Sequence, residues 1–196
     1  MDTPYTLKNP NEQQRRRELL HIPKMLSLTK YVEELRRRNL GEVPDFDPLD
    51  GGVEAAVLFL MEKPGRQANS SGFVSRNNPD PTARAIFEFS EIAEVPREVS
   101  CLWNTIPGWN GTTKLTNEER DKGIACLREL FDILPKLKVV VLVGKQAQRA
   151  EKYICYVKGP DFPIIKSAHP SIKVKNINPD MWHQIPLDWE KAHRYL

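Results

Sequence analysis

The chain has 196 residues, with 29 Lys or Arg and 26 Asp or Glu, so its net charge is +3. That length suits one compact domain, and a hydrophobic fraction of 40% excludes a wholly disordered chain. The longest apolar run is far shorter than the ~20 residues needed to span a bilayer, and the amino-terminal residues carry no apolar signal core. We therefore expect a cytoplasmic protein with no membrane partner.

The three cysteines, Cys101, Cys126 and Cys155, form no Cys-x-x-Cys pair. An odd count without metal-type spacing is typical of buried thiols in a reducing compartment. The sequence therefore predicts no metal bound through cysteine, and three of the four histidines show no metal-type spacing either: His21, His183 and His193.

The first fifty residues predict helices followed by a loop. Apolar side chains recur at three- and four-residue spacing, which places them on one helical face: Met25, Leu28, Val32 and Leu35. Residues 41–52 are rich in Gly, Pro and Asp, a composition typical of a loop. We expect a single domain over residues 1–196, with a helical extension at about 1–45.

Four apolar, β-branched runs follow the loop, at residues 55–61, 99–105, 138–144 and 162–168. Continuous rather than alternating apolarity indicates strands covered on both faces, as in a parallel sheet. Asp80-Pro81 predicts the start of a helix that runs to about Glu94, and Thr116 with Glu119 forms a capping box before another helix. Strands alternating with helices predict an α/β fold, a three-layer α/β/α domain with a short, mostly parallel four-stranded sheet.

In such a fold the ligand site lies beyond the carboxyl ends of the strands. The segments that follow the four predicted strands are Glu62-Lys63-Pro64-Gly65, Asn104-Thr105, Gly144-Lys145-Gln146 and His169-Pro170-Ser171. We therefore expect these side chains to gather at one edge of the sheet.

Several of these segments resemble the motifs of the uracil-DNA glycosylase superfamily. The first motif of that family is similar to Met61-Glu62-Lys63-Pro64-Gly65, and its base-stacking aromatic residue is matched by Phe73. Asn104 matches the asparagine that reads the pyrimidine edge, and His169-Pro170-Ser171 matches the His-Pro-Ser motif. The resemblance covers roughly residues 55–176 and implies an enzyme that extrudes a base from DNA.

The resemblance also implies a role for each residue. A flipped pyrimidine would stack on Phe73 and form hydrogen bonds with the amide of Asn104. His169 would stabilise the anion of the departing base, and Glu62 would orient water and balance the cationic sugar. Gly65 leaves space beside the 5-position of the pyrimidine. Hydrolysis by such a site needs only water, so we expect no cofactor.

Lys63 stands where the most familiar branch of the family has its water-activating Asp. A cation does not act as a carboxylate base, so the mechanism of that branch does not carry over. We expect Lys63 to pair with Glu62 or with a DNA phosphate. The alternative is attack of its amine on the sugar, which would make the protein a lyase.

The segment after His169 is expected to contact DNA. In the family an apolar side chain here fills the gap left by the flipped base, and Ile172 is the matching residue. Further DNA contacts are expected from its neighbours, Ser171, Lys173 and Lys175. Nine basic residues against two acidic ones between positions 136 and 175 also predict a positive face that suits a polyanion.

Together these observations predict a monomeric DNA glycosylase that hydrolyses the N-glycosidic bond of a flipped pyrimidine, uracil by default, in base-excision DNA repair. One alternative is a glycosylase for a 5-substituted pyrimidine, such as glucosylated hydroxymethylcytosine, in antiviral defence. The other alternative is a non-catalytic nucleic-acid-binding module, because Lys63 replaces the expected acid.

Overall fold

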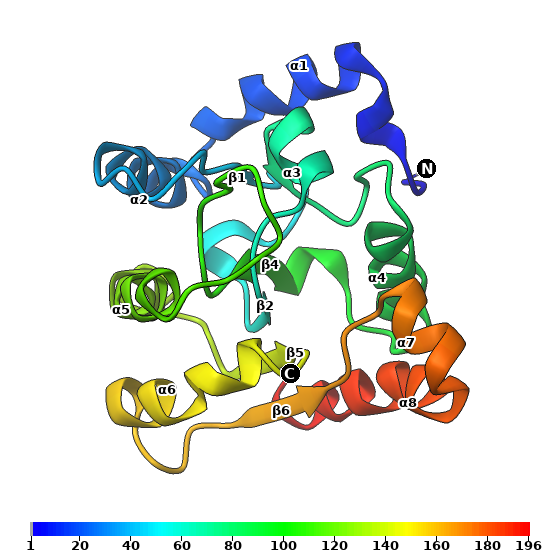
Figure 1. Ribbon diagram of the computed structural model, residues 1–196. Helices are drawn as coiled ribbons and strands as arrows, with labels where there is room; N and C mark the ends of the chain where they lie inside the picture. The colour runs from blue at the N-terminus through cyan, green and yellow to red at the C-terminus, as the bar shows by residue number, and fades with distance from the viewer. Residues whose placement is uncertain (1) are drawn as a thin grey trace.

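A computed structural model describes residues 2–196 and gives a three-layer α/β/α fold (Figure 1). The central sheet is entirely parallel and has the strand order β4-β2-β5-β6. Its strands are slightly shorter than the apolar runs that predicted them: β2 Val57–Met61, β4 Ser100–Asn104, β5 Val139–Val143 and β6 Ile164–Ser167. The predicted fold class is therefore confirmed.

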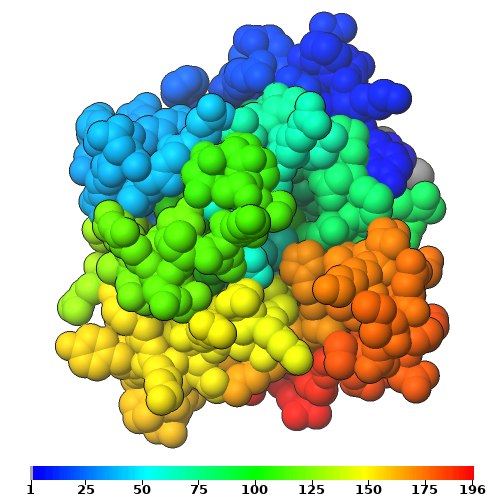
Figure 2. Space-filling view, viewed as in Figure 1, coloured from blue at the N-terminus to red at the C-terminus, as the bar shows by residue number. Residues whose placement is uncertain are grey.

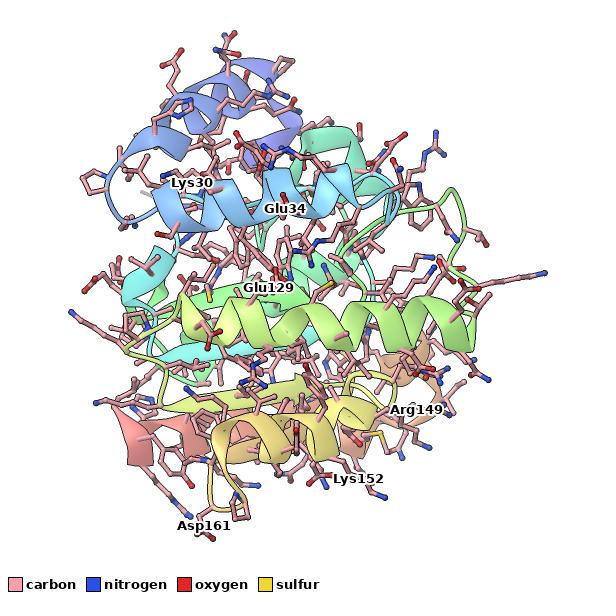
Figure 3. The ribbon with its side chains drawn as sticks, turned by 90° about the vertical axis from the view of Figure 1, so that its left-hand side faces the viewer. Lys30, Glu34, Glu129, Arg149, Lys152 and Asp161 are labelled. Atoms are coloured by element: carbon pink, nitrogen blue, oxygen red, sulfur yellow. The ribbon has the colours of Figure 1, made fainter. Side chains whose placement is uncertain are left out.

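Helices cover both faces of this sheet. Three of them lie one beside the next on one face, as Figures 1 and 3 show: α2 Leu26–Arg37, α5 Asn117–Asp132 and α6 Glu151–Lys158. Two more pack against each other on the opposite face: α4 Pro81–Ile92 and α8 Pro179–Glu190. This double cover explains why the strands are apolar throughout. Between residues 2 and 196, no helix has both the length and the apolarity to cross a membrane.

The capping residues that the sequence predicts lie at the starts of helices α4 and α5. The Asp80 carboxylate accepts a hydrogen bond from the Ala83 N–H at 2.9 Å and caps α4, with proline at the first helical position. Thr116 and Glu119 form the reciprocal capping box of α5. The apolar face predicted for the helix after Met25 is the buried face of α2.

The prediction of a loop over residues 41–52 is partly wrong. It contains a two-residue strand, β1 Asp45–Phe46, which pairs in parallel with β3 Phe73–Val74 in a second sheet. The Phe46 ring stacks on Trp103 with the ring centroids 3.8 Å apart, which ties this sheet to the core. Two-residue strands are too short to produce an alternating pattern, so the Gly, Pro and Asp composition alone predicted a loop here.

The remaining elements are short. Three α-helices are α1 Pro10–Glu18, α3 Arg66–Ser71 and α7 Ile172–Ile177. The 3-10 turns are Thr6–Lys8, Leu19–His21, Gly52–Glu54, Arg97–Val99, Ala147–Ala150 and Lys191–Tyr195.

A buried ionic cluster joins the amino-terminal helix to the segment after β3. The Arg16 guanidinium, on α1, is fully buried and forms an ion pair with Asp47. It also donates to Ser75 Oγ at 3.3 Å and to Asn77 Oδ1 at 3.1 Å. Arg97 approaches the same Asp47 carboxylate at 2.6 Å. Buried charges need such partners, so this cluster joins α1 to the side chains of Ser75 and Asn77.

Candidate active site

A cavity of about 360 Å³ lies at the carboxyl ends of the strands. Met61 at the end of β2, Asn104 at the end of β4 and His169 just after β6 all line it. Figure 2 shows this face hollowed between the segments around residues 65–75, 105–115 and 170–175. The volume lies within the range of small-ligand sites. A larger hollow of about 740 Å³ lies beside it, between the end of α2 and α5, away from Asn104 and His169.

Asn104 presents an unused amide to this cavity. The residue is only 2% exposed and lines the cavity, and no hydrogen bond joins its side-chain amide to another residue in the range 2–196. Its backbone is fixed, because the next N–H, of Thr105, donates to the Met61 carbonyl at 2.8 Å. Buried polar groups are normally hydrogen-bonded, so this amide offers one donor group and one acceptor to an occupant of the cavity.

His169 faces the same cavity from the end of β6. Burial lowers the pKa of its imidazole below the ordinary value, which keeps the ring neutral at neutral pH. Gly144 makes this position possible, because a Cβ there would lie 3.0 Å from the His169 Cβ. The backbone of Gly144 also has a φ of +92°, which favours glycine. Asn104 and His169 are thus brought together as the sequence predicts.

Gly65 lines the cavity and leaves its edge open. No atom lies within 4 Å of the point where a Cβ would stand at this residue. Its φ of −89° is one that any residue adopts, so a larger side chain fits the backbone here. The structure therefore has open space at Gly65, and its use by a pyrimidine substituent stays a prediction.

Phe73 does not line the cavity, in contrast to its expected role as the base-stacking residue. Its side chain is 0% exposed and belongs to the hydrophobic core. The neighbouring Val74 lines the cavity instead. Successive side chains of a strand point to opposite sides, so β3 turns Phe73 inward and Val74 toward the cavity. In this structure Phe73 offers no ring face to a ligand.

Glu62 also lies outside the cavity lining, whereas Met61 and Lys63 on either side of it belong to that lining. The alternation of side chains along extended backbone accounts for this result. Burial raises the pKa of Glu62, and the charges of Lys63 and Arg120 oppose that rise. The expectation that Glu62 supplies the carboxylate of the site is not met by this geometry.

The Lys63 side chain is buried and does not form an ion pair with Glu62. Its ammonium lies 2.8 Å from the Glu119 carboxylate and donates to Asn110 Oδ1 at 2.6 Å, and its side chain is only 4% exposed. Lys63 therefore ties the end of β2 to the capping box of α5 and to the loop that carries Thr113 into the cavity wall. Lys63 therefore pairs with Glu119 rather than with Glu62, which corrects the expected pairing, and in this structure its ammonium is engaged rather than free.

The residues after His169 begin helix α7 at the surface. The Ser171 hydroxyl caps this helix by accepting from the Val174 N–H at 3.3 Å. Ile172 is 49% exposed, a high value for a large apolar side chain. Lys173 and Lys175 are exposed, and the Lys175 ammonium also lies 5.5 Å from the Trp182 ring centroid.

The basic residues between positions 136 and 175 do not form one continuous positive face. Lys136 and Lys138 lie at the amino end of β5, whereas Lys145 and Lys173 follow the carboxyl ends of β5 and β6. Parallel strands place these two groups at opposite edges of the sheet. The sequence count therefore overstates the charge that surrounds the cavity.

The cavity lining also includes residues that no sequence motif marked as part of the site, and several of them carry charged or amide side chains. Arg66 is exposed at its edge, whereas Asn78 and Asp80 come from the segment between β3 and α4. The residue pair Asp80-Pro81 signals only a helix start, so nothing in the sequence marked Asp80 as a cavity residue. Among residues 2–196, no cluster of three or more His, Cys, Asp or Glu side chains has a metal-binding arrangement.

Compared with models of known protein families and with curated protein sequences, the chain matches none.

Proposed function

We propose that this protein is a DNA glycosylase that hydrolyses the N-glycosidic bond of a flipped pyrimidine. The observation that carries the proposal is that Asn104, whose amide makes no hydrogen bond within residues 2–196, lines one small cavity together with His169. An amide offers a donor and an acceptor in one plane, which matches the O4 and N3–H groups of uracil. The resemblance to the uracil-DNA glycosylase superfamily at these two positions supports the same assignment.

Hydrolysis of the N-glycosidic bond requires one group that stabilises the departing base and another that acts on the sugar. When the bond between C1′ and the base nitrogen breaks, its electron pair goes to the base, and negative charge develops on the O2 oxygen. A neutral His169 ring donates an N–H to that oxygen without adding a buried positive charge. Preorganised donors of this kind are among the largest contributions to catalysis.

The surface around the cavity suits a DNA backbone. Arg66, Lys145 and Lys173 are exposed, and within residues 2–196 no carboxylate lies within ion-pairing distance of them. Unpaired cations attract phosphates, and Ile172 is an exposed apolar side chain of the kind that fills a gap in a base stack. A nucleotide must leave its stack to enter a cavity of this size.

The first test measures release of the base from oligonucleotides that contain a single uracil, followed by alkaline cleavage of the abasic product. Wild type should produce the abasic site, and Asn104→Ala should reduce the rate by about 5- to 150-fold, because a bidentate base contact contributes about 1–3 kcal/mol. The exposed Asn176→Ala is the matched control and should behave as wild type. DNA binding without release of any base would instead indicate a non-catalytic module.

A second substrate class is favoured by the open space at Gly65. A 5-substituted pyrimidine, such as a hydroxymethylated or glucosylated cytosine, needs room beside its ring, and no atom occupies that region. We therefore expect Gly65→Tyr to abolish release of the substituted base and to leave uracil release within about threefold. Assays on both substrates check this result, and equal effects of Gly65→Tyr on both would contradict a role of Gly65 in selectivity.

A further inference from the structure

The cavity has one acidic side chain among its described lining residues, and it is Asp80. The two basic residues of the lining are Lys63, which is already paired with Glu119, and Arg66 at the exposed edge. Hydrolysis of an N-glycosidic bond develops positive charge on the sugar, so a carboxylate beside the sugar stabilises the transition state. Asp80 is placed to supply that charge, whereas Glu62 is not.

The carboxylate of Asp80 is held by the backbone rather than by a cation. Its Oδ1 accepts from the Ala83 N–H at 2.9 Å, and its own N–H donates to the Asn78 carbonyl at 2.8 Å. Asn78 is itself fixed, because its amide donates to the Phe73 carbonyl at 2.8 Å and its Oδ1 accepts from Ser71 Oγ at 2.6 Å. The position of Asp80 is thus set by hydrogen bonds within residues 71–83.

No cation within residues 2–196 neutralises this carboxylate. Burial raises the pKa of Asp80, while the N–H groups of Thr82 and Ala83 act in the opposite direction. Because a carboxylate has about four acceptor positions, the cap to Ala83 leaves capacity for a water molecule. A partly buried carboxylate that lines a cavity and has no counter-ion among residues 2–196 is a candidate functional group.

We propose that Asp80 is the catalytic carboxylate of this site, orienting the attacking water and balancing the positive sugar. This inference rests on the proposed glycosylase function. In the step, the bond between C1′ and the base nitrogen breaks and its electron pair leaves with the base. Water forms the new bond from oxygen to C1′ and gives one proton to Asp80. That proton then passes through solvent to the base anion, which leaves a neutral base, an abasic sugar and an ionised Asp80.

The competing explanation is that Asp80 only caps helix α4, and Asp80→Asn separates the two roles. Asparagine is as good a cap as aspartate, so the helix is kept while the charge is lost. We expect the single-turnover rate of base release to fall about 100-fold or more. Asp80→Ser keeps a capping hydroxyl and should lose the same activity. Urea unfolding of both variants should match wild type, which shows that the loss is not a folding defect.

Two further variants complete the experiment. Asp161→Asn changes an exposed aspartate on the loop between α6 and β6, labelled in Figure 3, and should keep the wild-type rate. Glu62→Gln tests the competing carboxylate and should lose much less activity than Asp80→Asn. If wild type releases the base and Asp80→Asn releases it equally fast, the proposed role of Asp80 is wrong, but the proposed glycosylase function stands. A wild type that releases no base from uracil or 5-substituted DNA would overturn the proposed function, and the role of Asp80 with it.

Discussion

Replacing His169 with alanine is expected to slow base release by about 100- to 1,000-fold while DNA affinity stays close to that of wild type. The side chain faces the cavity from the end of β6, where it acts on charge that develops only in the transition state. Single-turnover kinetics with excess protein separates this effect from binding. The matched control is His183→Ala, which removes an exposed histidine of α8 and should leave the rate unchanged.

The pH dependence sharpens this prediction. Burial lowers the pKa of His169 below its ordinary value of about 6.5, so the imidazole does not titrate in the neutral and alkaline range. The ratio of the wild-type rate to the His169→Ala rate should therefore be constant between about pH 7 and pH 9. A ratio that changes across this interval would show that the group acts as a titrating acid or base rather than as a fixed neutral donor.

The sequence was sufficient to predict the sheet and two of the residues at its edge. Long apolar runs define strands, and the position just after a buried parallel strand predicts which side chains meet, as Asn104 and His169 do. The caps of α4 and α5 were equally readable, because a cap depends on residues only three positions apart. Local sequence patterns predicted those features whose stabilising contacts lie within a few residues of each other.

The failures have a common physical origin in side-chain direction and long-range pairing. Glu62 and Phe73 lie in the predicted segments, but the alternation of side chains along extended backbone turns them away from the cavity. The partner of Lys63 is Glu119, 56 positions along the chain, and no spacing rule connects the two. Asp80 was assigned a cap and nothing more, although the same carboxylate also lines the cavity.

Replacing Asp47 with alanine is expected to lower the free energy of unfolding by about 3–5 kcal/mol. This carboxylate is fully buried and is shared by Arg16 and Arg97. Its removal breaks two ion pairs at once and leaves Arg16 paired only with Glu12, and Arg97 only with Asp50 and Asp2. Urea denaturation at pH 7 measures the loss. Glu54→Ala is the control, because its ion pair with Lys136 is exposed and such pairs contribute at most about 1 kcal/mol. Similar losses in the two variants would contradict a structural role for the buried cluster.

The pH dependence of that stabilisation follows from the sign of the pKa shift. Burial acts to raise the pKa of Asp47, but Arg97 and Arg16 outweigh it and hold the pKa below its ordinary value of about 3.9. The unfolded chain therefore binds the proton more readily, and the stabilisation is complete above about pH 4 and is lost as the pH falls through the lower pKa of the folded state. The difference in unfolding free energy between wild type and Asp47→Asn should stay constant from pH 7 to pH 5 and shrink below about pH 4. Burial raises the pKa of Asp50, and the charge of Asp47 adds to that rise, so Asp47→Asn also alters the titration of Asp50. Both proteins are therefore compared in an Asp50→Asn background, where Asp50 does not titrate. A difference that already shrinks between pH 7 and pH 5 would mean that the carboxylate of Asp47 is not held in its charged form by the two arginines.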